Sequence, residues 1–530
     1  MKRRHFLTLA GTAPALFPSI RAMAQAAPNA TITCGQSTSI VTLDPGFGAF
    51  TNYPGGYEAA LCLYDRLLDF DQDMKIVPSL ASSFEIAPDL MSIRLKLRPG
   101  VVFHDGTAVD AAAVTFNIKR MMDKARNPTN RPLWDPVSAV ETSDAATIVI
   151  RTRAPYAQLP NTLAHASGSL VSPAQIAKVG EKGFAQAPVG AGPYQMDSFN
   201  PGTELVLKAF DRYWGGKPGA SKLTFRFIAE SATRVSAIRT AAVDVIDSVP
   251  VNLAGALSHD PKLDLLHKPG LRPMGFAFNL TRPALSDVRV RQALNLAVPV
   301  DLIAQKIFFG YAKAPDSPLA FDTMGHVSIG RLVYDPNKAK ALLEEAGWKL
   351  GKDGIRKKDA ASLTLVLLTP EGLFPGDLSV TEIVANSLKE VGADARISKI
   401  EKGAYYDLVR QDRAHLGWDL AMFGFNPSNA SGLYQLQSLF KSNADDAKRP
   451  DVWNIGRYRN PAVDAALEKA NADPSTAVRD AAMAEAQKLI WQDTPYLWLQ
   501  VNETLSAVRK PITGVEVWPI VFTVLRRAKV

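Results

Sequence analysis

The chain has 530 residues, more than one hydrophobic core usually supports, so two or more domains are expected. Hydrophobic residues make up 47% of the chain and charged residues 21%, which is typical of a folded globular protein and excludes a largely disordered one. The formal net charge is +8, but four positive charges lie within residues 1–24. The remaining surplus is too weak to indicate binding to nucleic acid or to a membrane surface.

The first 24 residues, MKRRHFLTLAGTAPALFPSIRAMA, have the layout of an export signal. A basic start precedes a short apolar stretch, which one glycine and two prolines make unsuited to span a membrane. The pair Arg3 and Arg4 fits the twin-arginine pattern, and an ordinary secretory signal with two incidental arginines is the alternative. We therefore expect residues 1–24 to be a twin-arginine signal peptide and the mature protein to be free in the periplasm.

The chain contains two cysteines, Cys34 and Cys62. They could form a bridge in an oxidising compartment, but two cysteines do not make a disulfide framework. Cys62 also lies within an apolar helical pattern. This favours two buried thiols, with a bridge as the alternative.

The stretch LRPGVVFHDG raises the question of whether an adjacent histidine and aspartate form part of an active site. Alternating apolar and basic residues predict a strand at Ser92–Arg98, and a Pro-Gly and an Asp-Gly turn follow it. Asp110 is the expected N-cap of a helix at Ala111–Lys124. His104 and Asp105 thus lie in a strand–turn–helix junction, and we interpret them as turn residues. A chemical role is the alternative.

Helix and strand patterns alternate further along the chain, which favours an α/β fold. Ser286 and Asp287 are expected to open one helix, and Asp335 is the expected N-cap of another. Three more elements are expected: a strand at Ser362–Leu368, a helix at Val380–Val391 and a buried strand at Trp418–Gly424. The sequence contains no HExxH, GxSxG, P-loop or GxGxxG motif, so we predict no catalytic residue, no metal site and no cofactor.

Eight stretches, in a fixed order, carry a resemblance that extends over much of the mature chain. They are LDP at Leu43–Pro45, LYDRL at Leu63–Leu67, PSLASSFEIAPD at Pro78–Asp89, LRPGVVFHDG at Leu97–Gly106, PVGAGPY at Pro188–Tyr194, YWGGKP at Tyr213–Pro218, DVRVRQALNLA at Asp287–Ala297 and YDPNKAKALLEEAGW at Tyr334–Trp348. Each is weak alone, but the ordered set resembles the extracytoplasmic solute-binding proteins of ABC importers, family 5, which take dipeptides, oligopeptides and nickel complexes. Ala191 replaces a threonine and Pro299 an acidic residue that are common in the family, and neither change should disturb the fold.

The resemblance implies an α/β, two-lobed type II periplasmic binding protein fold with an extra subdomain in the first lobe. The implied parts are the signal peptide (1–24), the first lobe (25–65, 187–269 and 501–530), its inserted subdomain (66–186) and the second lobe (270–500). The chain would cross between the lobes near Pro269–Pro273 and Leu499–Asn502. The implied partners are a small-molecule or peptide solute and a membrane permease that recognises the closed form, and we expect a monomer.

The same resemblance places the ligand in the cleft between the lobes. The residues expected to bind it are Asn52, Tyr53, Tyr57, Trp134, Phe425, Asn426, Ser428 and Asn429, the last four from the segment GFNPSNASGL. Tyr405 and Tyr406 are weaker candidates. For each aromatic residue, packing in the core is the alternative.

The class of ligand is less well marked. Dipeptide-binding relatives meet the peptide's charged ends with an aspartate in the GFNPSNASGL region and an arginine near the helix before Gly392, and this chain has neither. Nickel-binding relatives have an arginine-rich strand where this chain reads HASGSL at His165–Leu170. Because unpaired buried charges are costly, we expect a peptide-like or other small solute, with a nickel or metal-chelate complex as the alternative. An exported hydrolase, which would turn over a substrate, and a chaperone, which would expose a large apolar surface, are alternatives of other classes.

Overall fold

The computed structural model describes residues 30–530 except residues 52, 446, 451–452 and 521. The predicted signal peptide and Asn52 lie outside the described residues. Among the helices that are described, none has both the length and the apolar character that a membrane span requires.

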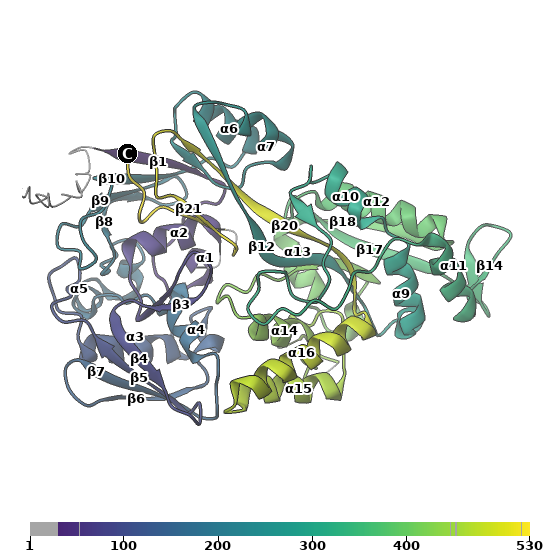
Figure 1. The fold of residues 1–530 in the computed structure, drawn as a ribbon, viewed down its shortest axis with the longest axis horizontal. Coiled ribbons are helices and arrows are strands. Elements are labelled where there is room, and N and C mark those ends of the chain that lie inside the picture. Colours follow the sequence, from purple (N-terminus) through teal and green to yellow (C-terminus); the bar gives the residue numbers. More distant parts are fainter. Residues whose placement is uncertain (1–29, 52, 446, 451–452, 521) are drawn as a thin grey trace, which may run out of the picture.

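A mixed sheet of 11 strands runs through the described part of the chain (Figure 1). Its strands are β1 (Thr31–Gln36), β8 (Tyr194–Asn200), β9 (Glu204–Ala209), β10 (Lys222–Phe227), β11 (Val245–Ile246), β12 (Leu263–Phe278), β13 (Ala312–Lys313), β17 (Thr364–Glu371), β18 (Asp394–Glu401), β19 (Leu420–Gly424) and β20 (Tyr496–Arg509). Their order is β18-β17-β19-β12-β20-β11-β1-β10-β9-β8, and β13 pairs with β20. The sheet therefore has two halves, which meet at β12 and β20.

The long antiparallel pair β12 and β20 passes from one half of the molecule to the other (Figure 1). Its register shifts between Pro269 and Pro273 and again between Pro273 and Gly275. Proline has no N–H to donate to the ladder, which explains the irregular pairing. Leu271 N instead donates to Pro519 O at 3.0 Å. Fewer ladder hydrogen bonds therefore hold the two strands together where the halves meet.

The hydrophobic cores divide the molecule into two lobes. The largest cluster takes its buried members from Met274 to Leu499 and forms the second lobe. The other clusters, apart from Ala430, use residues up to Leu271 and from Leu505 onwards, and they form the first lobe. The predicted two-lobed α/β architecture is therefore confirmed.

The first lobe also carries smaller sheets and helices. A four-stranded antiparallel sheet has the order β4-β5-β7-β6 and lies at one end of the lobe (Figure 1). The remaining elements of this lobe are α1 (Gly48–Thr51), α2 (Pro54–Leu63), β2 (Leu68–Phe70), β3 (Ile76–Pro78), β4 (Ala81–Ile86), β5 (Ser92–Leu97), α3 (Ala111–Met122), η1 (Arg131–Leu133), β6 (Val137–Thr142), β7 (Thr147–Thr152), α4 (Leu159–Ala164), η2 (Ala166–Gly168), α5 (Pro173–Phe184), α6 (Ser231–Arg239), α7 (Val251–Ser258), β21 (Glu516–Trp518) and β22 (Phe522–Val524).

Helices flank the sheet of the second lobe (Figure 1). They are α8 (Pro283–Ser286), α9 (Val288–Leu296), α10 (Val300–Lys306), α11 (Pro336–Glu345), α12 (Asp377–Glu390), α13 (Lys402–Val409), η3 (Arg413–His415), α14 (Gly432–Phe440), α15 (Pro461–Ala472) and α16 (Thr476–Asp493). A small sheet is formed by β14 (Lys349–Leu350), β15 (Arg356–Lys358) and β16 (Ala361–Ser362).

Local sequence decides where several helices begin. Asp110, Asp287 and Asp335 accept backbone N–H groups at the N-caps of α3, α9 and α11, which confirms the expected caps at Asp110 and Asp335 and the expected start of a helix at Ser286 and Asp287. Helix α12 begins at Asp377, earlier than the predicted Val380, because the apolar pattern used for the prediction starts only one turn into the helix. The strands β17 and β19 begin two residues later than predicted.

Cys34 in β1 and Cys62 in α2 are both free and buried, so the favoured prediction of two buried thiols is confirmed. Burial raises the pKa of each thiol above its usual value. A thiol with a raised pKa is a poor nucleophile, and both side chains act as small apolar groups in the core.

His104 joins the turn in LRPGVVFHDG to the PVGAGPY segment. Its Nδ1 accepts from Gly190 N at 3.3 Å, so its Nε2 carries the proton and donates to Gly192 O at 3.0 Å. The carboxylate of Asp105 accepts from Ser172 Oγ at 2.5 Å. Both side chains are engaged in holding loops together, which agrees with their interpretation as turn residues.

Acid should destabilise the fold through His104. Burial lowers the pKa of this imidazole to about 4, against about 6.5 in an unfolded chain. The neutral form therefore stabilises the fold fully above pH ~6.5, and this contribution is lost as the pH falls towards ~4. At pH ~5 we expect a loss of about 2 kcal/mol through His104. In urea unfolding at a series of pH values, H104Q should lose less stability than the wild type between neutral pH and pH ~5. An equal loss in both proteins would show that His104 is not the source of the acid sensitivity.

Candidate ligand site between the lobes

The segment GFNPSNASGL leads from β19 into α14 and forms the tip of the second lobe, where it contacts the first lobe. This region of contact between the two lobes is called the junction below. Ser431 caps α14 by accepting from Tyr434 N, and Asn429 Oδ1 accepts from Ser431 N at 3.1 Å. Ala430 has φ 56, a left-handed conformation that sharpens the turn. This turn carries Ala430 into a hydrophobic cluster of the first lobe.

Polar side chains fix the tip against the first lobe. Three hydrogen bonds between the tip and the first lobe join neutral groups and involve no ion pair. They are His165 Nε2 to Ser428 Oγ at 3.1 Å, Asn161 Nδ2 to Asn429 O at 3.0 Å and Asn426 Nδ2 to Ile520 O at 2.9 Å.

His165 acts as a neutral link in this contact. Burial, with a smaller effect from the positive charge of Arg66, lowers the pKa of His165 to about 3. Its Nδ1 accepts from Ser167 N at 3.0 Å, so Nε2 carries the proton and donates to Ser428 Oγ. The Ser428 hydroxyl proton then remains free to donate to a further group. His165 therefore links the two lobes through a hydrogen bond between neutral groups, not through an ion pair.

Tyr57 and Trp134 belong to the same first-lobe hydrophobic cluster that Ala430 of the tip enters. Tyr57 is fully buried, stacks on Phe522 with ring centroids 4.0 Å apart and meets the edge of His165 at 6.3 Å. Trp134 is also buried, and its Nε1 donates to Ser167 Oγ at 3.1 Å. Tyr57 Oη has no hydrogen-bond partner among the described residues. Core packing thus holds both rings, while one polar atom is left unsatisfied.

A second aromatic group lies on the other side of the junction. The ring of Tyr406 packs 5.6 Å from that of Trp453, and its phenol interacts electrostatically with Arg272 and with Tyr53. Tyr53 comes from the first lobe and is 50% exposed, so it is available to a ligand. Tyr405, by contrast, is fully buried and donates to Met422 O at 2.6 Å, so it is a core residue.

Several buried polar atoms near the junction lack a hydrogen-bond partner among the described residues. Buried polar groups in proteins are nearly always paired with protein, water or ligand, so these atoms are available to hydrogen-bond a molecule bound there. The atoms are Asn426 Oδ1, Asn429 Nδ2, Gln435 Oε1, Gln500 Oε1, Asn502 Oδ1 and Nδ2, Thr504 Oγ1, Tyr57 Oη and Ser169 Oγ.

Sequence reasoning missed the polar face of β20. Residues two apart along a strand share a face, so Gln500, Asn502 and Thr504 lie on one face of this crossing strand. The alternation of these residues with Val501 and Glu503 in QVNET interrupts an otherwise apolar strand. That interruption was the available signal, and it could have been found at a predicted crossing.

The predicted site residues are therefore placed as follows. Tyr57, Trp134, Asn426, Ser428 and Asn429 meet at the junction around the second-lobe tip. The ring of Phe425 packs against that of Tyr434, and Tyr53 lies on the Tyr406 side. Asn52 is outside the described residues. Within the described part of the chain, no group of three or more His, Cys, Asp and Glu side chains could hold a metal ion.

Two lobes joined by crossing strands can close on a molecule held between them. The chain belongs to the bacterial extracellular solute-binding proteins, family 5. The family model described as "Bacterial extracellular solute-binding proteins, family 5 Middle" matches residues 75–447. It is thus a solute-binding component of an ABC importer, and both the predicted family and this predicted role are confirmed.

Three known proteins illustrate the similarity. The glutathione-binding protein GsiB of Pectobacterium atrosepticum is 30% identical over 524 residues, which cover 98% of this chain and 96% of that protein. The substrate-binding protein CtaP of Listeria monocytogenes has a TM-score of 0.83 at 21% identity, covering 95% of this chain and 99% of its own. DppA of Helicobacter pylori, solved with the peptide STSA, has a TM-score of 0.77 at 24% identity, covering 95% and 98%.

Proposed function

We propose that this protein captures a peptide-like solute in the periplasm, between its two lobes, and delivers it to the permease of an ABC importer. The observation that carries the peptide-like class is the set of unsatisfied amide and hydroxyl groups at the junction. These groups offer both donors and acceptors, as a peptide backbone requires. The relative named for glutathione and the structure solved with a peptide support the same class.

The proposed movement is closure about the crossing strands. We keep the predicted parts: residues 25–65, 187–269 and 501–530 as the first lobe, 66–186 as its inserted subdomain and 270–500 as the second lobe. The irregular β12–β20 pairing at Pro269–Gly275 supports a hinge there, because few ladder bonds resist bending. A solute that touches both lobes shifts the population towards the closed form, which the permease recognises.

The proposed ligand-binding residues remain Asn52, Tyr53, Tyr57, Trp134, Phe425, Asn426, Ser428 and Asn429. The rings would contact apolar parts of the solute. Ser428 and Asn429 retain a free donor each, and Asn426 a free acceptor, which suits a neutral peptide group. The Tyr406 side, together with Gln500 and Asn502, extends this predicted set.

Thermal unfolding with a panel of solutes tests the proposal. The panel contains glutathione, short peptides, nickel–histidine complexes and sugars. A solute present at about 100 times its dissociation constant should add about 2.7 kcal/mol to the free energy of unfolding. We expect at least one peptide to do so and to be recovered unchanged by mass spectrometry. Stabilisation by a nickel complex alone would favour the metal-chelate alternative, and an altered peptide would favour the hydrolase.

The Y57F variant tests the site itself. It removes only a hydroxyl that lacks a partner, so the unliganded protein should be as stable as the wild type. If this hydroxyl bonds the solute, the dissociation constant measured by calorimetry should rise about fivefold, corresponding to about 1 kcal/mol. Y64F is the matched control, because Tyr64 Oη donates to Leu43 O at 2.6 Å away from the junction. Y64F should lose stability but keep its affinity, and the same pattern in Y57F would remove Tyr57 from the site.

A further inference from the structure

Arg272 occupies an unusual place at the junction. It lies in the irregular segment of β12, and its side chain passes over Gly424 at the end of β19. A Cβ at Gly424 would lie 2.2 Å from Met274 Sδ and 3.1 Å from Arg272 Cγ, so the glycine makes room for both side chains. The guanidinium carbon lies 5.7 Å from the centre of the Phe374 ring. The side chain is partly exposed, so a solute can reach it.

The positive charge of Arg272 has no partner. Its guanidinium makes no hydrogen bond and no ion pair with any residue in the described part of the chain. Burial lowers the pKa of Arg272, and the phenol of Tyr406 opposes this effect. The buried Arg120 and the partly buried Arg526, by contrast, each pair with an aspartate. A charge that is partly withdrawn from water and has no acidic partner is destabilised, and an arriving anion would offset this cost.

We propose that Arg272 anchors a carboxylate of the solute, which makes the cargo a peptide-like acid rather than a neutral molecule. This inference rests on the proposed function and deepens it. The planar guanidinium can bind both oxygens of a carboxylate, and it lies over the Phe374 ring. Tyr406 from the second lobe and Tyr53 from the first lie close enough to interact electrostatically, and their hydroxyls can donate to the same group. Because Tyr53 belongs to the opposite lobe, binding of the carboxylate would favour closure.

Calorimetry with matched acids and amides tests the anchor. The probes are glutathione and its glycine carboxamide, trialanine and its C-terminal amide, and the amide of Ala-Glu-Ala. Wild-type protein should bind each free acid about 30-fold more tightly than its amide, and R272Q should reduce this ratio to about one. R272K should keep part of the preference, because it keeps the charge but not the planar fork. Strong binding of the Ala-Glu-Ala amide would identify an acidic side chain as the source of the carboxylate, and weak binding would identify the C-terminus.

Stability without ligand provides an independent measurement. R272M removes the unpaired charge and keeps the apolar stem, so it should unfold at the same temperature as the wild type or above it. R120M is the contrast, because it leaves the carboxylate of Asp44 short of a partner and should lower the melting temperature.

The outcomes separate the two proposals. An R272M protein that is less stable than the wild type would show a structural role and overturn the anchor. An R272Q protein that binds peptides with an unchanged acid-to-amide ratio would also overturn the anchor. That result would leave the proposed function intact. If wild-type protein binds neither the acids nor the amides, the proposed function fails, and the peptide-like acid fails with it; binding of the amides alone overturns only the anchor.

Discussion

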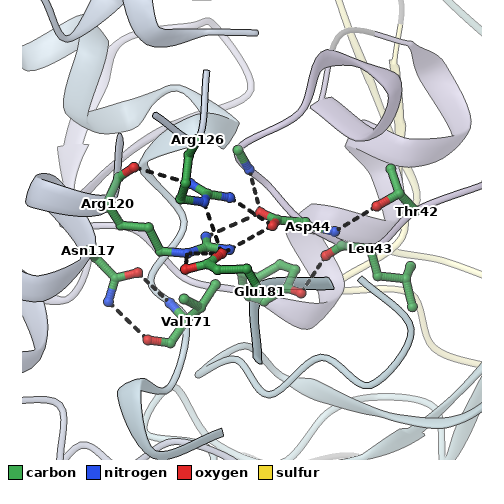
Figure 2. Close-up of polar contacts among 10 residues, drawn as sticks. Thr42, Leu43, Asp44, Asn117, Arg120, Arg126, Val171 and Glu181 are labelled. Atoms are coloured by element: carbon green, nitrogen blue, oxygen red, sulfur yellow. Dashed lines mark hydrogen bonds and ion pairs between the residues drawn. The ribbon is translucent and has the colours of Figure 1, made fainter. Parts of the chain in front are cut away.

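Replacing Asp44 by alanine is expected to lower the free energy of unfolding by about 3–5 kcal/mol, because it removes the buried carboxylate that two arginines share and leaves them only the partly exposed Glu181. The side chain of Asp44 is 1% exposed and accepts from Arg120 at 2.6 Å and from Arg126 at 2.9 Å. Figure 2 shows both guanidinium groups converging on this carboxylate, with Glu181 on the far side. The network joins the LDP stretch to α3 and α5 within the first lobe.

Glu181 offers a matched control for Asp44. It also contacts Arg120 and Arg126, at 2.7 and 2.9 Å, but its side chain is 42% exposed. An exposed ion pair contributes little, so E181Q should cost about 1 kcal/mol or less. Urea unfolding of the two variants measures the difference. Equal losses in D44A and E181Q would show that burial of the carboxylate does not decide the stability of this network.

Replacing Gln158 by alanine is expected to raise the dissociation constant of the solute about 100-fold. This side chain bridges the lobes: Nε2 donates to Gln437 Oε1 at 2.9 Å and to Asn471 Oδ1 at 3.4 Å, and Oε1 accepts from Ser431 Oγ at 3.1 Å. These bonds exist only while the lobes touch. At about 1 kcal/mol each they would stabilise the proposed closed form by about 3 kcal/mol, which is about 100-fold in affinity.

Calorimetry measures the affinity of Q158A, and small-angle scattering follows closure when solute is added. Gln175 provides the control, because its Nε2 donates to Ala187 O within the first lobe at 2.8 Å. Q175A should keep its affinity and close normally, whereas Q158A should bind weakly and remain more open. Unchanged affinity in Q158A would mean that its interlobe bonds do not contribute to the bound form.

Much of the local structure and the family could be predicted from the sequence. The N-caps at Asp110, Asp287 and Asp335 and the strand beginning at Ser92 depend on side chains within a few residues of each other. The interpretation of His104 as a turn residue likewise depended on the adjacent Asp-Gly turn. The family followed from the order of short stretches along the chain, which folding does not change.

Less of the candidate site could be predicted. The aromatic and amide residues around Tyr57 and the GFNPSNASGL segment came from the resemblance, and the structure brings several of them to one junction. Arg272 gave no signal, since an arginine beside a proline reads like any surface residue. Its importance lies in the absence of a nearby acid, and that depends on how distant segments pack.

The sequence by itself determined the elements, their caps and the class of protein, because each of those signals is contained in neighbouring residues or in their order. Only the tertiary structure decided which polar groups are buried without partners. Burial and pairing depend on segments as far apart as Tyr53, Arg272 and Tyr406, which the packing of the two lobes brings close enough for Tyr406 to interact electrostatically with the other two.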